Sequence, residues 1–147
     1  MKIKVLIILS VILLLLTFML YFTHLPGSEP LGKKKGLVAA KLKEKGISGG
    51  YIVISEKRHK WYNSILPNAV DQSFHLKGMA VDFWVMDLNK DGRWDEKDID
   101  LMLSIIFEAE KENPGLTGGT GTYLNSGFLA SRMVHTDVSG VQKIWQH

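Results

Sequence analysis

The run from Val5 to Phe22, 18 residues without a charge, is the feature that most limits how this chain can fold. As an α-helix it would be about 27 Å long, close to the roughly 30 Å hydrocarbon core of a bilayer. A cleaved signal peptide usually has a shorter apolar stretch and small residues at its cleavage site, and the segment 25–30 offers no Ala-x-Ala equivalent. We therefore predict a membrane anchor at residues 1–23, with a cleaved signal peptide as the alternative.

The rest of the chain is long enough for one domain with a hydrophobic core, which we place at residues 37–147. Residues 24–36 hold two prolines and three glycines and are predicted to be a linker. The chain has no cysteine, so it can form no disulfide and carry no lipid on a thiol. Removing Lys2 and Lys4 from the 18 basic residues leaves 16 against 15 acids, a balance that gives no footprint for nucleic acid.

Short stretches rich in β-formers alternate with helical patterns in this domain. They predict strands at 51–55, 79–85 and 133–138 and helices at 37–45 and 98–112. The segment from Gly118 to Gly121 is predicted to be a flexible rim beside the site described next, and Trp145 to close the core. The expected fold is α+β, with a small and mainly antiparallel sheet flanked by helices.

Two histidines and one acid form the first candidate site. His75 and His135 offer imidazole nitrogens and Asp82 offers a carboxylate oxygen, which is the ligand set of a catalytic zinc that keeps its fourth position open. A turn around Gly78 would fold His75 back over Asp82 on the following strand. On the later strand His135 and Asp137 are two residues apart, so their side chains share a face. The spacing predicts a zinc site with Asp137 beside it.

The pattern Ser-x-His-x-x-Gly-x-Ala-x-Asp over residues 73–82, followed by His-x-Asp at 135–137, resembles the zinc D-Ala-D-Ala carboxypeptidase and endopeptidase family, which includes hedgehog-like domains. The resemblance covers residues 47–145, with further matches at 52–58, Asn63, 118–123 and 141–145. It implies a hedgehog/DD-peptidase-like fold, zinc on His75, Asp82 and His135, and contact between Arg58 and the substrate.

One position departs from the family pattern. Several branches carry an acid three residues before the second histidine as general base, and Arg132 stands there in this chain. Asp137 is therefore our candidate for the general base, on strand geometry alone. Ser73 and Tyr123 are candidate substrate contacts beside Arg58. Two alternatives stay open: Tyr123 as a packing residue and Arg58 as a surface cation after a strand.

A second motif follows the Asp82 strand. Residues 87–98 have the spacing of an EF-hand or dockerin-like calcium loop, with Gly92 at the sharp turn. The predicted calcium ligands are the side chains of Asp87, Asn89, Asp91, Asp95 (through water) and Asp98, and the carbonyl of Arg93. Asp98 stands where glutamate is usual, so we expect a modest affinity, with a Kd of about 10⁻⁴ to 10⁻³ M. A plain Asp- and Asn-rich turn is the alternative.

The resemblance implies that the chain is a zinc-dependent peptidase, of D,D-carboxypeptidase or endopeptidase type, that hydrolyses peptidoglycan stem peptides or cross-links. The expected cofactors are zinc and, from the second motif, calcium. The N-terminal helix would hold it in the cell membrane as a single-pass protein, with its domain facing the periplasm or cell wall; cleavage of that helix would make it a secreted protein. The first alternative is a zinc- and calcium-stabilised module that binds wall peptides or a protein without cleaving them. The second is a calcium-regulated membrane protein in which the His/Asp pattern is incidental.

Overall fold

The computed structural model describes residues 2–23, 25–66, 69–127 and 130–146. Residues 1, 24 and 147, at which the predicted anchor, linker and domain begin or end, lie outside this description. The helices are α1 (Lys2–Thr23), α2 (Glu29–Glu44), α3 (Lys60–Ile65) and α4 (Glu96–Glu112), and the strands are β1 (Tyr51–Ser55), β2 (Ala80–Val85), β3 (Gly119–Thr122), β4 (Met133–Asp137) and β5 (Lys143–Gln146). Short 3-10 turns are η1 (Phe74–Lys77), η2 (Pro114–Leu116) and η3 (Ala130–Arg132).

The strands form one sheet in the order β1-β2-β4-β3-β5. The pairs β1–β2, β2–β4 and β3–β4 are antiparallel, and β3–β5 is parallel. The α+β class is therefore confirmed, with a mixed sheet. The register sets Asp82 on β2 directly opposite His135 on β4, and His135 opposite Gly121 on β3.

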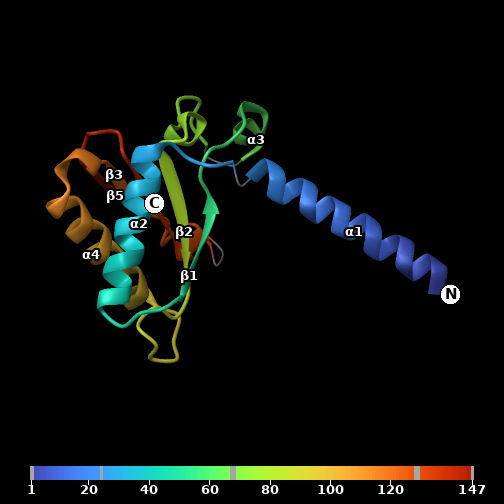
Figure 1. Ribbon diagram of the computed structural model, residues 1–147, viewed down its shortest axis with the longest axis horizontal. Coiled ribbons are helices and arrows are strands. Elements are labelled where there is room, and N and C mark those ends of the chain that lie inside the picture. The colour runs from blue at the N-terminus through green and yellow to red at the C-terminus, as the bar shows by residue number, and fades with distance from the viewer. Residues whose placement is uncertain (1, 24, 67–68, 128–129, 147) are drawn as a thin grey trace.

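The two faces of the sheet have different roles because successive side chains on a strand point to opposite faces. Val81, Phe83 and Val85 of β2 and Val134 of β4 belong to the hydrophobic core. Helices α2 and α4 cover this face (Figure 1) and contribute most of the remaining core residues: Leu31, Val38, Leu42, Ile99, Met102, Ile105, Ile106 and Ala109. The alternation leaves Asp82 and His135 on the opposite face.

Helix α2 begins at Glu29, eight residues before the helix predicted at 37–45, so eight of the 13 residues of the predicted linker are helical. Pro30 lies in the first turn, where its missing N–H is not needed, and Glu29 complements the positive end of the helix dipole. Packing is the main reason why the helix starts this early, since Leu31 is completely buried in the core. Prolines and glycines are typical of linkers, and the sequence does not show that Leu31 is buried. The segment was therefore predicted to be a linker.

The glycine segment is a strand rather than the predicted flexible rim. Gly119 to Thr122 form β3, buried in the sheet between β4 and β5. Its glycines are required by close approach: a Cβ on Gly121 would lie 2.1 Å from the ring of Trp145, and one on Gly118 would lie 2.1 Å from the backbone oxygen of Asp137. Trp145 is on β5, partly buried against Gly121 on the ligand face, and does not close the hydrophobic core as predicted.

Helix α1 projects away from the sheet and its covering helices (Figure 1), and the apolar side chains from Val5 to Leu15 are exposed. In the part of the chain that the structure describes, no helix has the length and apolar character that a membrane crossing needs.

Candidate metal centre

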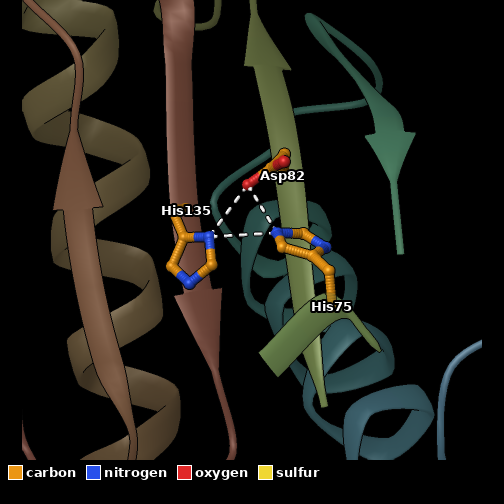
Figure 2. A group of neighbouring side chains, drawn as sticks. All are labelled: His75, Asp82 and His135. Carbon is orange, nitrogen blue, oxygen red and sulfur yellow. Dashed lines mark hydrogen bonds and ion pairs between the residues drawn. The ribbon is translucent and has the colours of Figure 1, made fainter. Parts of the chain in front are cut away.

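Among the described histidines and acids, one group of three is arranged to hold a metal ion: His75, Asp82 and His135. Figure 2 shows the three side chains converging from the turn before β2, from β2 and from β4. Nε2 of His75 lies 3.2 Å from Oδ1 of Asp82 and 3.2 Å from Nδ1 of His135. Nδ1 of His135 lies 2.9 Å from the same Asp82 oxygen. The predicted convergence of these residues is confirmed.

These three separations fit one small cation. Zinc binds imidazole nitrogen and carboxylate oxygen at about 2.0 to 2.1 Å, and a tetrahedron with such bonds has edges of about 3.3 Å. The observed edges are 2.9 to 3.2 Å, so an ion at the centre of the group needs only a slight widening. Around such an ion the three side chains would supply three corners of a tetrahedron and would leave the fourth for another ligand.

His75 is oriented by its backbone and by a carbonyl. Ser73 caps η1, and its hydroxyl accepts the N–H of His75 at 3.3 Å. Gly78 ends the turn with φ 68°, a left-handed conformation that favours glycine. Nδ1–H of His75 donates to the carbonyl of Glu56 at 2.6 Å, so Nε2 is the ring nitrogen that faces the metal position. Ser73, predicted to contact the substrate, is buried and shapes this turn.

Arg58 lies beside the ligand carboxylate. Its Nη2 donates to Oδ2 of Asp82, its Nε donates to Oγ of Ser55 at 2.7 Å, and its backbone N–H donates to the carbonyl of His75 at 2.9 Å. Asp82 thus has one oxygen on the guanidinium and the other at the metal position. Burial opposes ionisation of Asp82, but the charges and hydrogen bonds of His75 and His135 outweigh it and hold the pKa of this carboxyl well below its usual range.

An acid lies on each side of the His135 ring. Nδ1 faces Asp82, and Nε2 lies 3.8 Å from Oδ2 of Asp137 on the other side of the ring. Burial disfavours the imidazolium, but the hydrogen bonds and charges of Asp137 and Asp82 outweigh burial and raise the pKa of His135 to about 9. In the metal-free protein this imidazole therefore carries the proton that a metal would displace.

Asp137 is itself fixed in place. Its Oδ1 accepts the backbone N–H groups of Gly119 and Ser139, each at 2.9 Å. Its backbone carbonyl accepts the ammonium of Lys34 at 2.6 Å, and Lys34 forms a buried ion pair of 2.5 Å with Glu110. Burial lowers the pKa of Lys34, although the hydrogen bond and charge of Glu110 oppose the shift. The end of β4 is thereby tied to α2 and α4.

An aromatic pair, Trp145 and Tyr123, lies next to His135. The ring of Trp145 lies 5.6 Å from the imidazole, and the ring of Tyr123 meets Trp145 edge-on at 5.1 Å. Burial and the negative charge of Asp82 raise the pKa of Tyr123 to about 12, although the positive charge of Arg58 opposes the shift. Its hydroxyl is therefore a hydrogen-bond donor at neutral pH.

Arg132 has a partner away from the centre. Its Nη2 donates to the backbone carbonyl of Trp94, in the loop between β2 and α4. That loop is closed by Asp98, whose Oδ1 accepts the N–H groups of Leu88 and Asn89 at 2.8 and 3.1 Å and whose Oδ2 accepts that of Asp95 at 3.0 Å. The four acids predicted as calcium ligands do not gather as the metal group does, in the part of the chain that is described.

Sequence reasoning did not find several residues that orient the centre. The Glu56 carbonyl and the Ser55 hydroxyl act from the end of β1, and Lys34 acts from a helix that the sequence did not predict there. A backbone carbonyl leaves no trace in a sequence. Lys34 stands in a run of three lysines that looks like a solvated face, so no signal singled it out.

Comparisons of this chain with protein-family models, with curated proteins and with solved structures found no match.

Proposed function

We propose that this protein is a zinc-dependent peptidase acting on peptidoglycan stem peptides or cross-links. The observation that carries the proposal is the group of three ligand atoms separated by 2.9 to 3.2 Å, two of them nitrogens and one an oxygen. Zinc is the fitting metal because imidazole and carboxylate ligands with an open fourth position are typical of catalytic zinc. The substrate class and the DD-peptidase-like fold come from the resemblance of residues 47–145 to that family.

Zinc held by these residues would lower the pKa of its water towards about 7 and polarise the carbonyl of the scissile bond. The residues around it have separate tasks. The carbonyl of Glu56 orients the ring of His75 by a hydrogen bond, and the carboxylate of Asp137 lies 3.8 Å from His135, each at the ring nitrogen remote from the metal position. We therefore assign Asp137 a positioning role in place of the general-base role predicted from the sequence.

Arg58 takes a different task from the one the resemblance implies. Its guanidinium is bound to Asp82 and Ser55, so it holds the ligand carboxylate with one oxygen directed at the metal. The hydroxyl of Tyr123, protonated at neutral pH, would donate to the oxygen that becomes negative as the carbonyl is attacked. In this proposal Tyr123 contacts the substrate, whereas Ser73 and Arg58 support the ligands.

The predicted anchor at residues 1–23 completes the proposal by placing the domain next to the wall, outside the membrane. A non-catalytic module that binds wall peptides is the second candidate. It is favoured by one observation: Arg132, at the position of the usual general base, is directed to Trp94 and not to the centre.

The full chain in detergent, incubated with purified wall sacculi, separates the two candidates. Mass spectrometry should detect released muropeptides that disappear with a chelator and return with zinc. His75→Gln and Asp82→Asn should abolish release, whereas His59→Gln, a histidine outside the metal group, should retain it. Stoichiometric zinc uptake without any released product would overturn the peptidase and support the binding module.

A further inference from the structure

The four residues 25–28, which precede α2, are packed against the domain, and we call them the strap. Leu25 forms an isolated antiparallel bridge with Lys57, in which the N–H of Lys57 donates to the carbonyl of Leu25 at 3.3 Å. The N–H of Ser28 donates to the carbonyl of Gly78 at 2.7 Å. These contacts join segments that lie about 30 to 50 residues apart in the sequence, so the described part of the predicted linker is attached to the domain on both sides.

Glu56 connects the strap to the metal centre. Its Oε2 accepts the N–H of Gly27 at 3.0 Å, and its Oε1 pairs with the ammonium of Lys35 on α2 at 2.5 Å. Its backbone carbonyl accepts Nδ1–H of His75 at 2.6 Å. The same residue therefore holds the strap with its side chain and orients a metal ligand with its main chain.

The strap also contacts the other end of the turn that carries His75. Gly78 ends this turn, and its N–H donates to the carbonyl of His75 at 3.1 Å. A Cβ on Gly78 would lie 3.4 Å from the backbone N of Ser28 and 3.5 Å from Cα of Gly27, so the strap lies directly on the turn. His75 is thus held at two points, Glu56 and Gly78, and the strap is bonded to both.

Gly27 is the position at which the strap comes closest to these contacts. A Cβ on this residue would lie 2.5 Å from Cδ2 of Leu31 and 3.1 Å from both Oε2 of Glu56 and the carbonyl oxygen of Gly78. Leu31 is completely buried, so it has no free space into which to move. A side chain at Gly27 would therefore push the strap away from Glu56 and Gly78 together.

We propose that the strap is a positioning element of the metal centre, and that Glu56 is the positioning residue through which it acts on His75. The strap fixes both ends of the turn, so that Nε2 of His75 is directed at the metal position before the metal binds. The inference rests on the metal centre of the proposed function but does not need hydrolysis. By thermodynamic linkage, a strap that strengthens metal binding must itself be held more firmly when the metal is bound.

Zinc titration of the full chain in detergent, in competition with a chelator, tests this role. Gly27→Ala should weaken zinc binding about tenfold, the lower end of the effect of altering the groups that orient a ligand. Gly36→Ala adds the same methyl group where nothing lies within 4 Å, and should bind zinc like the unaltered chain. Glu56→Ala should also weaken zinc binding. Glu56→Gln should retain most of the affinity, because its amide oxygen can still accept the N–H of Gly27.

Hydrogen exchange of the unaltered chain tests the same role without a substitution, so the result does not depend on whether a variant folds. Zinc should slow exchange of the N–H groups of Gly27, Ser28 and Lys57 about tenfold, the factor that linkage requires. The N–H of Gly46, which bonds to Lys43 beyond the opposite end of α2, should exchange at an unchanged rate.

The outcomes separate the strap from the rest of the proposed function. Zinc that binds without slowing exchange in the strap, or Gly27→Ala that binds zinc as tightly as Gly36→Ala, would overturn the positioning role. A chain that binds no zinc would overturn the metal centre and the role of the strap together. Zinc binding with the expected effects but no muropeptide release would support the strap and count only against the peptidase.

Discussion

Raising the pH should destabilise the metal-free protein through His135. Its pKa is about 9 in the folded chain and 6.5 in the unfolded chain. A raised pKa means that the folded state binds the proton more tightly, so the stabilisation is complete below pH 6.5 and is lost as the pH rises to about 9. The shift corresponds to about 3 kcal/mol, at about 1.4 kcal/mol for each pKa unit.

Urea denaturation of the chelator-treated full chain in detergent, followed by circular dichroism, measures this loss. Other groups also titrate in this range, so the quantity to compare is the difference in unfolding free energy between the unaltered chain and His135→Gln. That difference should fall by about 3 kcal/mol between about pH 6 and pH 9.5. His59→Gln is the matched control and should show no such change. A difference that is independent of pH would refute the assignment of the proton to His135.

Two further predictions concern packing around the centre. Gly121→Ala should cost about 1 to 3 kcal/mol in urea denaturation, because its Cβ would lie 2.1 Å from the Trp145 ring, whereas Gly115→Ala meets nothing within 4 Å and should be nearly neutral. Equal effects of the two would contradict the close approach. Lys34→Met should cost about 3 to 5 kcal/mol because it leaves Glu110 buried and unpaired. Adding Glu110→Met should recover part of that loss, and a double variant no more stable than the single one would contradict the ion pair.

The ligand group could be predicted from the sequence because its spacing has a direct structural meaning. Ser73 and Gly78 mark the ends of the turn that carries His75, and alternation along β2 and β4 puts Asp82 and His135 on one face. The three main strands were also predicted from a local signal, because short runs rich in β-forming residues indicate strands.

The parts that could not be predicted depend on contacts between distant segments. Glycines allow flexibility in isolation, but in β3 they allow Trp145 and Asp137 to approach the backbone. Strand geometry placed Asp137 beside His135, yet only the full structure shows that it faces the ring nitrogen opposite to the metal position. The partner of Arg58 likewise depends on the fold, because a cation after a strand could equally face the substrate or the solvent.

X-ray absorption spectroscopy of the zinc-loaded full chain tests the central claim most directly. We predict one zinc per chain, bound by two imidazoles, one carboxylate oxygen and one water at about 2.0 to 2.1 Å, with the second imidazole signal lost in His135→Gln. A fourth protein ligand that closes the site, or zinc uptake that is unchanged in His135→Gln, would contradict an open catalytic centre built from His75, Asp82 and His135.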